Sequence, residues 1–270
     1  MMIRKSTGAL VAAVSLIAAV AHAQTTPAKE FEPTVGQAGK DVVWVPSPVE
    51  TVERMLDVAK LTPQDFVVDL GSGDGRNIIA AAKRGARGLG VEFNPDMVEL
   101  SKRNAAREGV ADRAQFVQGD MFEADFSKAT VLALFLLPSN LERLNAKFLN
   151  LTPGTRIVAN TFGITGWTAD QTVHLGDACT SWCTVLLYTV PAKVGGQWQA
   201  PQGTVTIEQT AQTFTGALAG TPLLEGKVNG DRVSFTVGGV AYAGRVAGGR
   251  IEGTMTSGTN TTKWVATRAQ

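Results

Sequence analysis

The strongest structural signal in this chain is the stretch Val67-Val68-Asp69-Leu70-Gly71-Ser72-Gly73-Asp74-Gly75-Arg76. An apolar run typical of a β-strand ends at an acidic residue, three glycines follow at alternate positions, and residues 77–84 favour a helix. Glycines let the backbone turn sharply and let a ligand approach it without a Cβ in the way. A strand, a glycine-rich turn and a helix N-terminus are the parts of a nucleotide-type cofactor site.

Two further predicted strands also end at an acid, in Leu89-Gly90-Val91-Glu92 and in Phe116-Val117-Gln118-Gly119-Asp120. A carboxylate at the end of the second strand suits a bidentate contact to ribose hydroxyls. A dinucleotide site would require a third small residue where this chain has Arg76. Each acid alone could equally be a strand-end or helix-cap carboxylate, but three in series around one glycine turn indicate a binding site.

In this combination the chain resembles the class I S-adenosylmethionine-dependent methyltransferases. The resemblance implies an α/β fold with a Rossmann-like doubly wound sheet and S-adenosyl-L-methionine as cofactor. In that family the residue at the position of Asp120 often meets the adenine amino group. The cofactor-binding residues implied are Asp69, Gly71, Ser72, Gly73, Asp74, Gly75, Glu92, Phe93, Asn94, Asp120 and Met121.

Two shorter motifs, Trp44-Val45-Pro46-Ser47-Pro48 and Leu136-Leu137-Pro138, narrow the resemblance. Together with the glycine turn, these motifs resemble those of a subgroup of small prokaryotic methyltransferases. That subgroup is itself similar to the eukaryotic mitochondrial lysine methyltransferases. The likeness covers about residues 41–198. It implies Pro46 and Pro48 beside the cofactor, and Leu137, Pro138 and Ser139 beside the acceptor.

The segment after the fifth predicted strand departs from that subgroup. This chain has Asn160-Thr161-Phe162-Gly163 where relatives tend to have a His-Asp pair. Asn160 therefore joins Leu137, Pro138 and Ser139 as a candidate catalytic residue. The resemblance implies N-methylation of a protein lysine, and an apolar pocket would favour the neutral amine. Four aromatic residues could form the wall of this pocket: Trp44, Phe135, Phe162 and Trp167. Each could equally be a core residue.

The N-terminus reads as a signal peptide covering residues 1–23. Arg4 and Lys5 precede an apolar run, and Ala21-His22-Ala23 supplies small residues for cleavage after Ala23. An uncleaved anchor is the alternative, although the run is short for a membrane span. Both interpretations place the folded part outside the cytoplasm, because the basic end stays inside, and cleavage predicts a periplasmic or secreted protein. Because S-adenosylmethionine is made in the cytoplasm, an exported non-catalytic binding or structural module that retains the fold is the rival function.

Alternating β and α patterns predict a parallel sheet with helices on both faces. After a linker at 24–40, the methyltransferase domain is expected at 41–195 and a small all-β meander or open barrel at 196–270. In the first domain, strands are expected at 66–70, 88–91, 114–118, 130–136 and 156–160, helices at 49–60, 77–84, 95–108 and 139–149, and a closing hairpin at 172–175 and 183–190.

Few other residues in the sequence suggest a catalytic, redox or metal-binding role. Cys179 and Cys183 could form a disulfide across a hairpin turn, or remain two small, partly buried thiols. His174 is the one histidine after residue 23 and is expected on a strand, which excludes a paired-histidine zinc motif there. The chain has 25 basic and 24 acidic residues, a balance that gives no electrostatic footprint for nucleic acid. We therefore expect no nucleic-acid partner and no metal.

Overall fold

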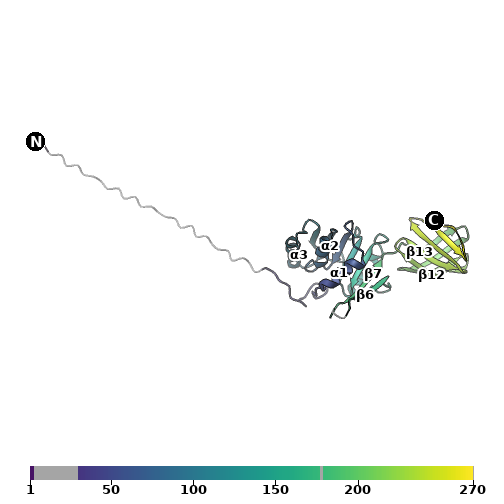
Figure 1. Ribbon diagram of the computed structural model, residues 1–270, viewed down its shortest axis with the longest axis horizontal. Coiled ribbons are helices and arrows are strands. Elements are labelled where there is room, and N and C mark those ends of the chain that lie inside the picture. The colour runs from purple at the N-terminus through teal and green to yellow at the C-terminus, as the bar shows by residue number, and fades with distance from the viewer. Residues whose placement is uncertain (3–29, 177–178, 270) are drawn as a thin grey trace. The chain divides into compact units, whose positions relative to one another are not determined.

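The carboxyl-terminal ends of five parallel strands create the crevice in which the candidate site lies. The computed structural model describes residues 1–2, 30–176 and 179–269, and the predicted signal peptide lies almost entirely outside these residues. Within 31–270 the described strands form two sheets (Figure 1).

The first sheet has seven strands in the order β3-β2-β1-β4-β5-β7-β6. Five are parallel, and the last two form an antiparallel hairpin whose β7 pairs with β5. Their bounds are β1 Phe66–Leu70, β2 Arg87–Glu92, β3 Ala114–Gln118, β4 Val131–Leu134, β5 Arg156–Asn160, β6 Gln171–His174 and β7 Thr184–Thr189. The strand order reverses between β1 and β4, and ligands of open α/β sheets bind at such a switch point.

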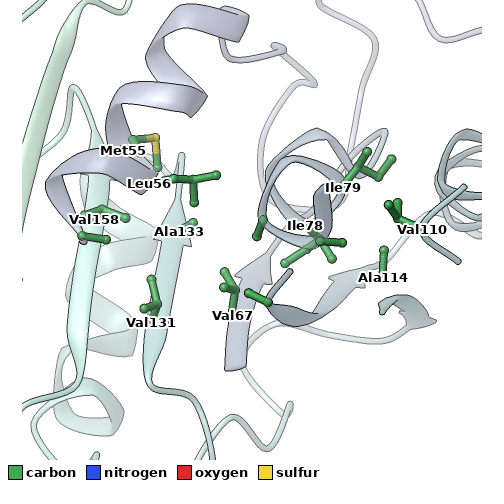
Figure 2. Packing of buried hydrophobic residues seen from close by; sticks show 14 of the residues in the cluster. Met55, Leu56, Val67, Ile78, Ile79, Val110, Ala114, Val131, Ala133 and Val158 are labelled. Atoms are coloured by element: carbon green, nitrogen blue, oxygen red, sulfur yellow. The ribbon is translucent and has the colours of Figure 1, made fainter. Parts of the chain in front are cut away.

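In the described part of the chain, four helices cover this sheet: α1 Val49–Val58, α2 Arg76–Lys83, α3 Pro95–Arg107 and α4 Pro138–Phe148. Side chains alternate between the two faces of a strand, so Val67 packs against α1–α3 while Val68 packs against α4. Figure 2 shows the first of these cores, where Met55 and Ile78 reach down from their helices onto the strands.

The predicted elements agree with this architecture, and the differences fall at their ends. The first helix ends two residues early, because Lys60 takes a left-handed conformation with φ of 51°. The fourth strand ends at Leu134 instead of 136. Phe135 and Leu136 therefore leave the sheet and reach the pocket described below.

The second sheet is antiparallel. Its strands are β8 Gly196–Ala200, β9 Gly203–Thr210, β10 Thr213–Leu218, β11 Thr221–Pro222, β12 Leu224–Asn229, β13 Arg232–Val237, β14 Val240–Ala247, β15 Arg250–Ser257 and β16 Asn260–Arg268. The additional pairing of β9 with β10 closes the sheet into a barrel. The sequence had predicted a meander or an open barrel. Aromatic rings fill the interior, with Phe235 stacked on Tyr242 at 4.8 Å between centroids.

None of the helices in the described ranges is long and apolar enough to cross a bilayer.

Candidate active site

A pocket of about 470 Å³ opens at the switch point of the parallel sheet. Gly71 follows β1, Glu92 ends β2, and Phe135 follows β4, and all three line it. This volume lies within the range of about 300–1,000 Å³ typical of small-molecule sites.

The glycine turn forms one wall of the pocket. The backbone N–H groups of Gly71 and Ser72 both donate to the carbonyl of Val91, at 2.8 and 3.0 Å, which fixes the turn against β2. Gly71 lines the pocket. Gly73 has φ of 55°, and a Cβ there would lie 2.6 Å from Nε1 of Trp44. The turn therefore requires glycine both for its conformation and for its close contact with Trp44.

Glu92 is held in a fixed orientation. Its Oε2 accepts a hydrogen bond from the N–H of Gly73 and its Oε1 accepts one from the N–H of Asn94, each at 2.9 Å. Each carboxylate oxygen can accept a second bond, which suits a pair of ribose hydroxyls. Phe93 and Asn94 also line the pocket, as does Met121. The structure thus brings together this part of the predicted cofactor set.

Asp120 lines the same pocket and is paired with Lys40. Its Oδ1 accepts a hydrogen bond from the N–H of Phe122 at 2.9 Å, and its Oδ2 accepts one from Nζ of Lys40. The hydrogen bond from Lys40 is the main reason that the pKa of Asp120 lies below its ordinary value. Asp120 is therefore an ionised acceptor beside the pocket.

The segment 37–43 was not among the predicted site residues, yet it lines the pocket. Residues 37–40 belong to the segment 24–40 that was expected to be a linker, and they contribute to the pocket lining. The Nζ of Lys40 also lies 4.9 Å from the ring centroid of Phe93. The segment shows neither helical nor strand periodicity. The one feature of the sequence that could have indicated a role in the site is Lys40, a cation just before the apolar run 42–45.

Other predicted cofactor residues support the turn from outside the pocket lining. Asp69 is buried and accepts a hydrogen bond from Nδ2 of Asn77 at 3.0 Å, which ties β1 to α2. Burial raises the pKa of Asp69 well above its ordinary value. Asp74 pairs with Arg76 at 2.6 Å. The remaining predicted residues outside the lining are Pro46, Pro48, Ser72, Gly73 and Gly75.

Asn160, a candidate catalytic residue from the sequence, forms a hydrogen bond to the Pro46-Ser47-Pro48 segment. It is fully buried, lies outside the pocket lining, and donates from Nδ2 to Oγ of Ser47 at 3.0 Å. Arg76 donates to the carbonyl oxygen of the same Ser47. The Pro46-Ser47-Pro48 segment is thereby held from two sides, which places the neighbouring Trp44 and Val45 in the pocket wall.

Apolar side chains also line the pocket. Leu137 lines it, whereas Pro138 and Ser139 are exposed at the start of α4 outside the lining. Of the four predicted wall aromatics, Trp44, Phe135 and Phe162 line the pocket. Trp167 does not, because it is buried in the core against Tyr188, 5.5 Å away between ring centroids.

Trp182 takes a place in this wall that the sequence had not suggested. It lies between Cys179 and Cys183, which form a disulfide, so the structure decides between the two states considered for these cysteines.

His174 is exposed on β6 and its Nδ1 lies 3.0 Å from Oγ1 of Thr184, as expected for a sheet residue. Among the described residues, no group of three or more potential ligands could hold a metal ion.

These residues fit S-adenosyl-L-methionine. Glu92 offers two oriented oxygens for the ribose, Asp120 offers an acceptor for an amino group, and Gly71, which has no Cβ, allows a ligand to approach the backbone closely. The apolar residues Phe135, Leu137 and Phe162 line the same pocket.

Comparisons with known proteins agree with this fit. Residues 69–171 match the family described as "ANTKMT methyltransferase domain". The protein-lysine N-methyltransferase of Saccharolobus islandicus is 41% identical over 152 residues, which cover 55% of this chain and 94% of that protein. A lysine N-methyltransferase of Mus musculus, named for a component of ATP synthase, is 36% identical over 173 residues, covering 63% of this chain and 66% of that protein.

A solved structure matches as well. An RNA methyltransferase from Salinibacter ruber in complex with S-adenosyl-L-homocysteine has 45% identity and a TM-score of 0.52, covering 56% of this chain and 96% of that one. Fold and site together define a class I S-adenosylmethionine-dependent methyltransferase. Within that class, the chain belongs to the ANTKMT methyltransferase family.

Proposed function

We propose that this methyltransferase transfers its methyl group to the side-chain nitrogen of a protein lysine. The observation that carries the proposal is the acceptor end of the pocket, where Phe135, Leu137 and Phe162 adjoin the cofactor floor. The names of the Saccharolobus and mouse relatives, both lysine methyltransferases, support it.

The chain's contribution at the donor side is orientation. When bound, S-adenosyl-L-methionine supplies a methyl group on a positively charged sulfonium, which is a good leaving group. Glu92, fixed by two backbone N–H groups, would hold the ribose, and Asp120 would accept from the adenine amino group. Holding two reactants in line converts a bimolecular step into an effectively unimolecular one.

At the acceptor side the chain acts by excluding water. A lysine ammonium has no lone pair, so it must lose a proton to solvent water as it enters the pocket before its nitrogen can attack. Burial against Phe135 and Phe162 disfavours the charged form and lowers the pKa of the lysine. The same apolar wall packs against the alkyl part of the lysine side chain and directs its nitrogen to the cofactor end.

RNA is the second acceptor to consider, because the Salinibacter protein is named an RNA methyltransferase. This chain carries 25 basic and 24 acidic residues. Proteins that bind nucleic acid use clustered positive charge against the phosphates. The charge balance therefore favours the protein lysine.

Labelling with tritiated cofactor tests the proposal. The protein is incubated with S-adenosyl-[methyl-³H]methionine and either a bacterial envelope protein extract or total RNA. We expect protease-sensitive label on protein, recovered as methyllysine after hydrolysis and absent with Glu92→Ala. Glu99→Ala, whose side chain is 61% exposed on α3, is the matched control and should retain labelling. Label found only on RNA, or on a protein residue other than lysine, would contradict the proposal.

A further inference from the structure

Trp182 completes a three-ring wall at the acceptor end of the pocket. The rings of Phe135 and Phe162 are nearly parallel, with centroids 6.2 Å apart and an interplanar angle of 11°. Trp182 lies tilted against both, at 5.2 Å from Phe135 and 5.8 Å from Phe162. The three side chains come from distant parts of the sequence and meet in the lining of the pocket.

The backbone of Trp182 takes a conformation that bulky residues rarely adopt. Its φ is 58°, in the left-handed region where a Cβ is disfavoured. Such residues persist only where the surroundings hold them, and they cluster at functional sites. Here the carbonyl oxygen of Trp182 accepts a hydrogen bond from Oγ1 of Thr51, a fully buried residue of α1, at 3.1 Å.

The disulfide is the second restraint on Trp182. Cys179 and Cys183 close a loop that has Trp182 as its last inner residue. The carbonyl oxygen of Cys183 accepts a hydrogen bond from the N–H of Leu175 at 2.8 Å, which ties that end of the loop to the β6–β7 hairpin. The cross-link thus limits the positions that the Trp182 ring can reach.

We infer that Trp182 contacts the acceptor side chain and that the Cys179–Cys183 disulfide positions it there. This inference rests on the proposed function, since it takes the acceptor to be an amine on an alkyl chain. An indole face packs well against an alkyl stem and attracts the positive charge that develops on the nitrogen during methyl transfer. The cysteines act through Trp182, so the oxidised protein binds acceptor more tightly than the reduced protein.

Dithiothreitol reduces this disulfide. The dithiol gives two electrons and two protons to the Cys179–Cys183 bond, which becomes two thiols, while dithiothreitol becomes a cyclic disulfide. The loop then loses its cross-link, and the left-handed backbone at Trp182 loses one of its restraints.

Steady-state kinetics test the role of Trp182, with the acceptor protein identified by the tritium labelling as the substrate. Trp182→Ala should raise the acceptor KM about tenfold and leave the cofactor Kd unchanged, while Trp182→Phe should restore most of the loss. Trp264→Phe, a buried tryptophan of the barrel, is the matched control and should behave as wild type. An unchanged acceptor KM in Trp182→Ala would overturn the inference.

The thiol state is tested with the same assay. Dithiothreitol should raise the acceptor KM of the wild type and have no effect on a Cys179→Ser/Cys183→Ser variant or on Trp182→Ala. A response that persists in Trp182→Ala would show that the disulfide acts elsewhere, and would refute the positioning role.

Fluorescence separates this inference from the proposed function. The difference between the emission of wild type and Trp182→Phe reports the surroundings of that ring without any acceptor. We expect this difference spectrum to change on reduction, and an unchanged spectrum would overturn the inference whatever the acceptor is. If the wild type labels no lysine, the proposed function fails instead.

Discussion

Gly73 shows how one absent side chain shapes the pocket. A Cβ at this position would lie 2.6 Å from Nε1 of Trp44, and its own N–H donates to Glu92. The glycine therefore sets both the position of an aromatic wall residue and the orientation of the carboxylate expected to bind ribose. Its spacing with Gly71 and Gly75 was visible in the sequence, whereas its contact with Trp44 follows only from the fold.

Gly73→Ala should weaken cofactor binding at least about tenfold, because Trp44 must move and the left-handed backbone becomes strained by about 1–3 kcal/mol. Gly109→Ala is the matched control, since Gly109 has φ of 69° with nothing within 4 Å of the added Cβ. It should lose stability but keep its cofactor affinity. Equal affinities for the two variants, measured by titration calorimetry, would contradict this account of the turn.

At the scale of elements, Asp65 joins the ends of several strands. It accepts hydrogen bonds from the N–H and Oγ1 of Thr62, at 2.8 and 2.9 Å, and from Oγ1 of Thr130 at 2.7 Å. It also pairs with Arg156, the first residue of β5, whose guanidinium donates to the carbonyl of Ala59 after α1. Burial alone would raise the pKa of Asp65, but the hydrogen bonds and Arg156 hold it below its ordinary value.

Asp65→Ala should destabilise the protein by about 2–4 kcal/mol at neutral pH, because Thr62, Thr130 and Arg156 lose hydrogen bonds to a charged, buried acceptor. A lowered pKa contributes stability above the ordinary value of about 3.9, and this is lost as pH falls through the folded-state pKa. The stability gap between wild type and variant, measured by urea unfolding, should therefore shrink in acid. Asp112→Ala, 65% exposed, should cost less than about 0.5 kcal/mol. A pH-independent gap would exclude this role.

Helices and strands were predictable where the apolar residues of the sequence followed a single pattern, either helical or strand-like. β1 and β5 begin and end as expected, because buried apolar runs bounded by turns leave little choice. The pocket contributions of Lys40 and Trp182 could not be foreseen, since both lie in irregular segments placed by long-range contacts with Asp120 and Thr51. The sequence left Trp167 as either a wall or a core residue, because an aromatic residue in a loop looks the same in sequence in both cases, and the structure places it in the core.

For the whole molecule, the sequence combines a methyltransferase fold with a predicted export signal and a disulfide. Disulfides persist in oxidising compartments, so the Cys179–Cys183 bond supports the proposal that the protein is periplasmic or secreted. The signal itself, residues 1–23, lies almost entirely outside the described residues.

Export is checked by intact-mass analysis after cell fractionation. We expect the protein in the periplasmic fraction with Gln24 as its first residue and a mass two hydrogens below that of the reduced chain. An Ala21→Lys/Ala23→Lys variant should retain the segment, because cleavage requires small residues at both positions. Protein found in the cytosol with its first 23 residues intact would contradict the proposal.

The central claim is that the pocket at the switch point of the sheet binds S-adenosyl-L-methionine through Glu92. Titration calorimetry on wild type, Glu92→Ala and the exposed control Glu99→Ala tests it most directly. Hydrogen bonds to a charged group contribute about 1.5–3 kcal/mol each, so Glu92→Ala should bind at least about tenfold more weakly while Glu99→Ala binds as wild type. No binding by wild type, or the same affinity in Glu92→Ala, would contradict the account.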